Sequence, residues 1–517
     1  MADVNGTQHI GYFVLRLHCA NSLSSGLLGN WSGVWHIPHK PIVWTHLLLI
    51  FPKKMQKREF TDLEDMRLLY RGNKILGDLF SKSVHSIRQI TDDESAAKGC
   101  YRFLQNDRIS EEDIVSNMVA NCQVACKDKY VVCLQDTSEI NLRSHSRRIN
   151  KDSSIGTTNA KGDKGLGFLL HPSLVVDAYD CVPYGYADVK VWNRPLVFKS
   201  KFERKYNALP IEEKESYKWI EVSRNTQSAL RDTVAGMVIV QDREGDIYEQ
   251  FAVIPDDKTD LLIRARTNRT LADKTKLFTC LSAEQKKGSY ELLVDGKPGK
   301  KKRIAEIEIR YKQVELKKTA GTSKGVAATT KLYLIEAKEV NYSGSDKICW
   351  RLLTTIPVQT IEIAQTCVEW YSWRWTIEEV FKILKKEGYN IEASELEYAT
   401  SVRKLSLMIM EVIIKLFLMR LAYAEPEVEL SADTCFSDEE QEFLEHQITH
   451  LEGKTVKQQN PFKTKDLKRY VWAIARMGGW KGYESKRHPG ITTLWIGLKK
   501  FKAAMQGWEL FRNVSTR

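Results

Sequence analysis

Two short apolar segments of this chain end in the same dipeptide, and this repeat constrains the fold more than any other feature. The segment Tyr130–Leu134 is followed by Gln-Asp, ending at Asp136, and the segment Gly236–Val240 is followed by Gln-Asp, ending at Asp242. Short apolar runs bounded by polar residues are typical of buried strands. The pattern therefore predicts two buried strands, each with a carboxylate at its end.

Further segments predict that these strands belong to an α/β sheet, because strands and helices alternate along the chain. Within residues 267–356, alternating segments and a basic loop indicate a mostly β insertion in that core. The predicted strands are 167–176, 182–192, 261–266, 304–311 and 330–335, the basic loop is 297–303, and a crossover helix is predicted at 218–231.

The chain has 517 residues, which exceeds the usual size of a single core and predicts several structural units. Residues 1–54 stand apart, because they hold five of the 11 histidines and show little periodicity. Three-to-four spacing predicts helices from Phe60 to about Lys127, and Thr91–Glu94 predicts a capping box that opens one of them. The predicted parts are an atypical extension (1–54), a helical segment (55–128), the first part of the core (129–266), the β-rich insertion (267–356), a core helix (357–400) and a helical C-terminal region (401–517).

Charge and composition narrow the possible functions. Lys and Arg outnumber Asp and Glu by 78 to 66, which gives a net charge of +12 and favours a polyanionic partner, although many basic proteins bind no nucleic acid. The 10 cysteines include no CxxC pair, which argues against a disulfide framework or a zinc ribbon and fits a reducing, cytoplasmic setting. The longest apolar run, Ile42–Phe51, is about half a membrane span, so we expect no membrane partner.

Acids at the ends of two strands can converge on one point, but such acids are common in α/β proteins and do not by themselves define a metal site. A site for two hard cations, which supports phosphoryl transfer, needs further carboxylate ligands. Glu378 is the candidate third ligand. On one continuous helix, at about 100° per residue, it would lie within roughly 60° of Tyr371, Arg374 and Lys385. The alternative is an amphipathic helix with a solvated charged row, on which Glu379 points elsewhere.

The spacing of Tyr371, Arg374, Glu378 and Lys385 resembles the YREK signature of bacterial insertion-sequence transposases of the DDE type, the IS-four group that includes the transposase of the transposon Tn-five. The segment Asp242–Asp246 resembles the DREAD-type box of that family, and Asp136 with the following threonine resembles its first motif. Weaker similarity is carried by 96–106, 473–479 and 485–487, so that the resemblance covers roughly residues 56–517.

The resemblance implies a ribonuclease-H-like core in which Asp136, Asp242 and Glu378 bind two Mg²⁺ ions, with Mn²⁺ as a substitute. It also implies that five residues contact DNA. Tyr371, Arg374 and Lys385 would hold the phosphate backbone at the transposon end, Trp350 would stack on a base flipped from the duplex, and Arg264 would contact DNA nearby. Without the family, Trp350 would be a core aromatic residue and Arg264 a surface residue.

The same resemblance implies a bacterial cytoplasmic enzyme that acts on nucleoid DNA by cut-and-paste transposition. The helical segment after Met55 would bind the terminal inverted repeats, and C-terminal helices would pair two protomers in a synaptic complex with target DNA. The apolar residues of those helices, Trp472, Trp480, Trp495 and Leu498, could equally form a local core. Residues 1–54 have no counterpart in the family pattern.

Two other functions remain open. A ribonuclease-H-like nuclease or resolvase would cut without strand transfer and need not carry the YREK row or Trp350. A non-catalytic DNA-binding or inhibitory descendant of a transposase would be expected to lose its metal ligands first. All three candidate acids are present in this chain, which argues against the second alternative.

Overall fold

The computed structural model describes residues 35–37, 40–42, 58–63, 65–82, 86–91, 93–158, 165–196, 209–294, 302–318, 322, 325–386, 388–425, 428–483 and 488–515. The predicted extension 1–54 lies outside this part, apart from a small hairpin of β1 (Trp35–Ile37) and β2 (Lys40–Ile42). The motif 485–487 also lies entirely outside it. The chain divides into two compact units: unit 1 is Met1–Leu47, Lys205–Arg224 and Gly236–Thr376, and unit 2 is Leu48–Arg204, Asn225–Ala235 and Ile377–Arg517.

Unit 1 contains a mixed sheet. Its strand order is β7 (Gly236–Gln241), β8 (Thr259–Arg264), β12 (Cys349–Thr354), β11 (Thr329–Glu339), β10 (Arg303–Lys317) and β9 (Gly288–Val294). Strands β7 and β8 are parallel and joined through helix α6 (Tyr248–Val253), since parallel neighbours need a crossover connection, and the remaining pairs are antiparallel. All six residues of β7 are buried, as its apolar sequence predicts.

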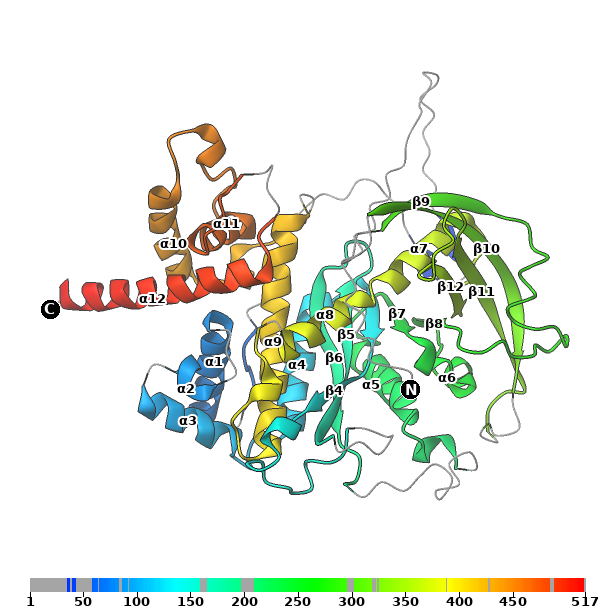
Figure 1. Cartoon of the computed structure of the whole chain (residues 1–517), viewed down its shortest axis with the longest axis horizontal. Coiled ribbons are helices and arrows are strands. Elements are labelled where there is room, and N and C mark those ends of the chain that lie inside the picture. Colours follow the sequence, from blue (N-terminus) through cyan, green and yellow to red (C-terminus); the bar gives the residue numbers. More distant parts are fainter. Residues whose placement is uncertain are drawn as a thin grey trace. The chain divides into compact units, whose positions relative to one another are not determined.

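The β-rich insertion is built around the long antiparallel pair β10 and β11 (Figure 1). Along most of β10, buried residues alternate with less buried ones, which is the pattern of a strand with one face packed on a core. The strands predicted at 304–311 and 330–335 are therefore confirmed and extend further than the sequence indicated.

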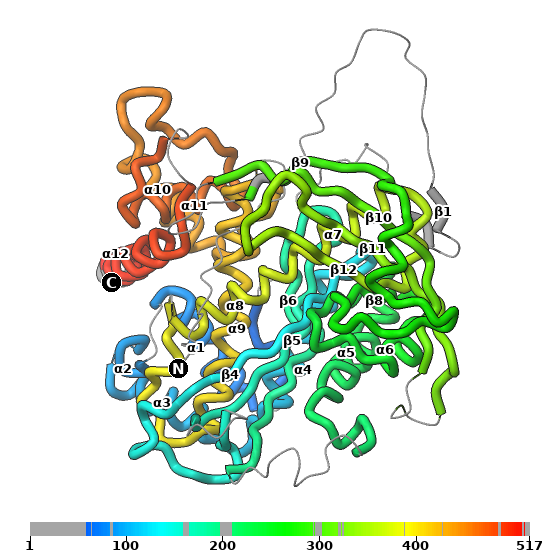
Figure 2. Tube along the Cα trace, turned by 45° about the vertical axis from the view of Figure 1, so that its right-hand side comes forward, coloured from blue at the N-terminus to red at the C-terminus, as the bar shows by residue number. Residues whose placement is uncertain are grey.

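In unit 2, the strands β3 (Tyr130–Gln135) and β4 (Ser138–Asn141) pair with β5 (Gly167–Asp177), and β6 (Pro183–Trp192) also pairs with β5. Figure 2 shows β4, β5 and β6 running side by side. Both units combine strands with helices, and most strand pairs within each unit are antiparallel, which confirms the predicted α/β class.

The helices predicted between Phe60 and Lys127 are α1 (Met66–Ser81), α2 (Ile87–Ile90), α3 (Glu94–Leu104) and α4 (Glu111–Cys126). The predicted capping box at Thr91 is wrong, because Asp93 caps α3 by accepting the Ala96 N–H at 2.7 Å. Thr91 instead ends α2, and its hydroxyl donates to the Ile87 carbonyl. The N-cap of α3 is therefore Asp93, two residues later than the sequence predicted.

The centre of unit 2 is α9 (Ala399–Ala424), most of whose 26 residues are buried. A helix that is apolar on nearly all sides is expected in the interior of a large unit. The C-terminal helices are α10 (Asp438–Leu451), α11 (Leu467–Met477) and α12 (Ile491–Ser515). Trp472, Trp495 and Leu498 are buried within this single chain, so they form the local core that the sequence left open.

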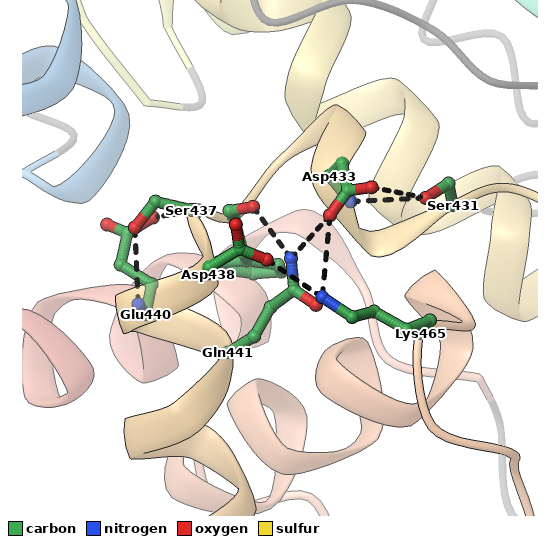
Figure 3. Close-up of polar contacts among 8 residues, drawn as sticks. Ser431, Asp433, Ser437, Asp438, Glu440, Gln441 and Lys465 are labelled. Carbon is green, nitrogen blue, oxygen red and sulfur yellow. Dashed lines mark hydrogen bonds and ion pairs between the residues drawn. The ribbon is translucent and has the colours of Figure 1, made fainter.

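Helix α10 begins with a complete capping box, in which Ser437 and Glu440 satisfy each other's backbone N–H groups at 3.2 and 2.8 Å. Gln441, which is 3% exposed, donates to Asp433 Oδ1 at 2.8 Å and to the Phe436 carbonyl at 3.1 Å (Figure 3). These bonds fix the start of α10 to the turn that precedes it. None of the helices in the described part of the chain is long and apolar enough to span a membrane.

Candidate functional site

Asp136 lies at a break between two strands that share one partner. In the register of β3, Gln135 faces Ser173, and in that of β4, Ser138 faces Leu170, so that Asp136 stands opposite Pro172. Proline has no N–H to donate to a neighbouring strand. The hydrogen-bond ladder between the strands can therefore open at this point. Asp136, which directly follows β3, is half-buried.

The turn after Asp136 is fixed by hydrogen bonds within unit 2. Asp136 Oδ1 accepts the N–H of Thr137 at 2.8 Å, and the Thr137 hydroxyl lies 2.7 Å from Nδ1 of His171, a fully buried residue of β5. No local sequence pattern singles out His171. Its only signal would have been its position opposite Thr137, which requires the strand register.

Asp242 follows β7 directly and caps the short 3₁₀ turn Arg243–Gly245. Its Oδ1 atom accepts the N–H of Glu244 at 2.7 Å, and the side chain is half-buried. Its second oxygen, Oδ2, accepts no hydrogen bond from any residue that the structure describes. One oxygen is thus anchored to the backbone and the other is available, which fits a carboxylate that ligates a hard cation.

Asp246, the second acid of the same motif, has a different environment. Its side chain is fully buried, forms an ion pair with Arg269 and accepts the Arg266 N–H at 2.8 Å. Buried carboxylates are normally paired in this way. Asp246 therefore ties the loop 242–246 to the segment after β8, whereas Asp242 stays accessible at the end of β7.

The predicted single helix through Tyr371 and Lys385 is wrong. The structure has α7 (Ile361–Ser372) and α8 (Trp375–Lys385), separated at Trp373 and Arg374. The Arg374 N–H bonds to the carbonyl of Tyr371, three residues back, and this tighter 3₁₀-type turn interrupts the α-helical ladder. The helical wheel therefore applies to Glu378 and Lys385, which are seven residues apart on α8, but it does not extend to Tyr371 and Arg374.

Two neighbouring glutamates on α8 have distinct surroundings. Glu379 forms an ion pair with Arg420 of α9 at 2.8 Å, so its side chain is directed toward α9 within unit 2. Glu378 is one helical step away and is half-exposed. Lys385 forms an ion pair with Glu392 at 3.4 Å, and Glu392 also accepts the N–H of Asn141 at the end of β4. A hollow of about 610 Å³ lies beside this pair and is lined by Asn141, Arg143, Ser144, Asn390, Glu392 and Ala393.

Trp350 and Tyr371 pack against each other in unit 1. Their rings meet edge to face with centroids 5.4 Å apart, and the residues are 7% and 3% exposed. Arg374 is also buried, at 8%, while half-buried Arg264 donates to the carbonyl of Cys349 at 3.3 Å. As they stand, the two rings form part of a core, so contact with DNA would require them to become exposed.

The three candidate metal ligands are distributed over both units, with Asp242 in unit 1 and Asp136 and Glu378 in unit 2. Among the residues that the structure describes, no three His, Cys, Asp or Glu side chains are grouped closely enough to hold a metal ion. The donor chemistry nevertheless fits Mg²⁺, because all three candidates are half-exposed carboxylates and Mg²⁺ prefers oxygen ligands.

Two comparisons with protein families identify the chain's domains. Residues 55–109 match the family described as Transposase DNA-binding, and residues 226–413 match the family described as Transposase DDE domain. These domains make the chain a DDE transposase. The second match contains Asp242 and Glu378, whereas Asp136 precedes it. The mixed α/β structure agrees with the ribonuclease-H-like core of a DDE domain, which confirms the predicted fold class.

The DNA-binding domain of the transposase contains α1, α2 and α3. Its α1 exposes Met66 and Tyr70, at 71% and 72%, beside exposed Arg67. Arg58, near the start of the domain, is buried and pairs with Glu411 of α9 at 3.1 Å. The domain is therefore joined to the centre of unit 2 by a buried ion pair, a link that no local sequence pattern reveals because its partners lie 353 residues apart.

Proposed function

We propose that the transposase catalyses cut-and-paste DNA transposition of a bacterial insertion sequence of the YREK-bearing IS-four group. The observation that carries the proposal is the DDE domain at residues 226–413, whose acid after β7, Asp242, has one oxygen anchored by a backbone N–H and the other available. In this proposal Asp136, Asp242 and Glu378 hold two divalent cations, with Mg²⁺ as the natural metal and Mn²⁺ as a substitute. When bound, such ions activate the attacking oxygen and stabilise the leaving oxygen of a phosphodiester.

The proposed reaction consists of successive phosphoryl transfers at the ends of the element. Water first cuts one strand, and the freed 3′ hydroxyl then attacks the opposite strand and closes a hairpin. Hydrolysis reopens the hairpin, and the 3′ hydroxyl attacks target DNA. Each step breaks one phosphodiester bond as another bond to phosphorus forms, so no nucleotide cofactor is consumed.

The remaining candidate residues act on DNA in this proposal. Lys385 exchanges its contact with Glu392 for a backbone phosphate at the transposon end, since a lysine ammonium suits a phosphate as a point charge. Tyr371 and Arg374 hold the same backbone and Arg264 contacts it nearby. Trp350 leaves its contact with Tyr371 to stack on a flipped base, as aromatic side chains do with extruded bases.

The proposal also assigns partners and a place in the cell. The DNA-binding domain binds the inverted repeats, two protomers assemble on a pair of ends, and the complex acts on nucleoid DNA in the cytoplasm. The burial of Trp472, Trp495 and Leu498 within one chain leaves other parts of the C-terminal helices to form the contact between protomers.

The test compares two neighbouring glutamates. The full chain is incubated with Mg²⁺ and linear DNA that carries the sequences flanking its own gene. Hairpin-ended and joined products are expected from the unmodified chain and from Glu379→Gln, because Glu379 pairs with Arg420 of α9 and a neutral amide in its place can still accept a hydrogen bond from that guanidinium. Glu378→Gln is expected to bind the DNA without cutting it.

Three outcomes would overturn the proposal. Equal cutting by Glu378→Gln would exclude that residue from the chemistry. Cut fragments without hairpins or joined products would identify a nuclease. Binding without any cleavage by the unmodified chain would identify a non-catalytic descendant of a transposase.

A further inference from the structure

Two buried amide side chains lie next to the loop 242–246, and the proposed chemistry does not use them. Gln241 is the last residue of β7 and Gln250 belongs to α6, and both are completely buried. An amide taken out of water costs free energy unless it is hydrogen-bonded. Their burial beside the candidate metal ligand Asp242 therefore points to a local role.

The two amides bond to each other reciprocally. Gln250 Nε2 donates to Gln241 Oε1 at 2.7 Å, and Gln241 Nε2 donates to Gln250 Oε1 at 3.1 Å. Gln241 Nε2 also donates to the hydroxyl of Ser223 at 3.0 Å, and that hydroxyl donates to the Trp219 carbonyl at 2.7 Å. Ser223 and Trp219 belong to α5 (Tyr217–Leu230), so the amide pair joins α5, β7 and α6 within unit 1.

The amide pair is connected directly to the backbone that carries Asp242. Gln250 Nε2 donates to the Gly245 carbonyl at 3.0 Å, and the Gly245 N–H donates to the Asp242 carbonyl at 3.2 Å. The loop also approaches Gln241 closely, because a Cβ added at Gly245 would lie 2.2 Å from Gln241 Oε1. The loop and the amide pair therefore fit together only with glycine at position 245.

We propose that Gln241 and Gln250 are positioning residues for metal binding. Their amide pair holds the loop in the turn that directs Asp242 Oδ1 to the Glu244 N–H and leaves Oδ2 for a divalent cation. This inference rests on the proposed function, in which Asp242 is a metal ligand. Residues that orient a ligand from behind commonly change metal affinity by about 10-fold to 100-fold when they are replaced.

The test replaces the amide while keeping a similar side-chain volume. Gln241→Met is compared with Gln441→Met, a matched control that breaks a buried amide network on α10 in unit 2 (Figure 3). Hydrogen exchange of the Glu244 and Gly245 amides is measured in the metal-free full chain. Mn²⁺ affinity is measured by electron paramagnetic resonance in the presence of transposon-end DNA.

Gln241→Met is expected to speed exchange at both amides and to weaken Mn²⁺ binding by about 10-fold to 100-fold. Gln441→Met is expected to change neither quantity. Unchanged exchange or unchanged Mn²⁺ affinity in Gln241→Met would overturn the inference. If Gln241→Met does not fold, Ser223→Ala applies the same test by removing one hydroxyl, and unchanged exchange at Glu244 and Gly245 would again contradict it.

An Asp242→Asn variant separates failure of the inference from failure of the proposed function. If Asp242→Asn keeps both Mn²⁺ binding and cleavage, the proposed function fails. If Asp242→Asn loses both while Gln241→Met keeps normal Mn²⁺ affinity, the proposed function stands and the positioning role of Gln241 is wrong.

Discussion

Replacing Arg58 with methionine is expected to weaken the attachment of the DNA-binding domain to α9. The Arg58 guanidinium lies 3.1 Å from Glu411 Oε1, and both side chains are only 3% exposed. The variant leaves the Glu411 carboxylate buried, with the Asn121 amide at 3.0 Å still donating to it. Removing one member of a buried ion pair typically costs about 3–5 kcal/mol.

Hydrogen exchange along α9 and α1 measures this loss as a free energy of local opening. Because about 1.4 kcal/mol corresponds to a factor of ten, exchange should accelerate by roughly two to three and a half powers of ten. Lys98→Met is the control, since its ion pair with Glu94 is largely exposed and is worth well under about 1 kcal/mol.

A double variant tests the cause of the effect. Arg58→Met combined with Glu411→Leu removes both charges, so it should recover much of the stability lost in Arg58→Met alone. The reasoning would be refuted if Arg58→Met accelerated exchange no more than Lys98→Met does. It would also be refuted if the double variant were as unstable as the sum of its two single changes.

Three further predictions concern individual side chains. Gly245→Ala should lower the free energy of unfolding by about 1–3 kcal/mol and slow cleavage, because its Cβ would overlap Gln241 Oε1. Calorimetry measures the first effect and the cleavage assay the second. Glu392→Gln should release Lys385 from a partly exposed ion pair and tighten DNA binding up to about fivefold, as measured by fluorescence anisotropy, and unchanged affinity would argue against a phosphate contact of Lys385. Burial raises the pKa of the Glu369 carboxyl, so the folded state disfavours its ionisation. In denaturation assays, Glu369→Gln should have the same free energy of unfolding as the parent chain at acidic pH and a higher one as the pH rises above the ordinary glutamate pKa.

Several features of this transposase could be predicted from short stretches of sequence. The buried strand β7 and the acid that follows it were predicted correctly, because a run of apolar residues ending in polar ones is a local pattern. The helices of the DNA-binding domain follow from their three-to-four spacing for the same reason. Even there, local reasoning assigned the cap of α3 to Thr91, whereas Asp93 makes the bond.

The break between α7 and α8 shows where local reasoning fails. Periodicity predicted one helix from Tyr371 to Lys385, but a 3₁₀-type turn at Trp373 and Arg374 separates two helices. Tyr371, Arg374, Glu378 and Lys385 therefore do not lie on one face of a single helix. Glu378 keeps its candidate role through its own exposure on α8, whereas Trp350 and Tyr371 are packed as core residues.

The sequence by itself determined the fold class, the two strands that end in Gln-Asp and the family resemblance, because each depends on residues close together in the chain. Only the tertiary structure decided which of the acids are anchored and which are available, as the contrast between Asp242 and Asp246 shows. It also decided the partners of Arg58 and Gln241. Buried charges and amides must find hydrogen-bond partners wherever the fold brings them, and those partners are set by the packing of strands and helices that lie far apart in the sequence.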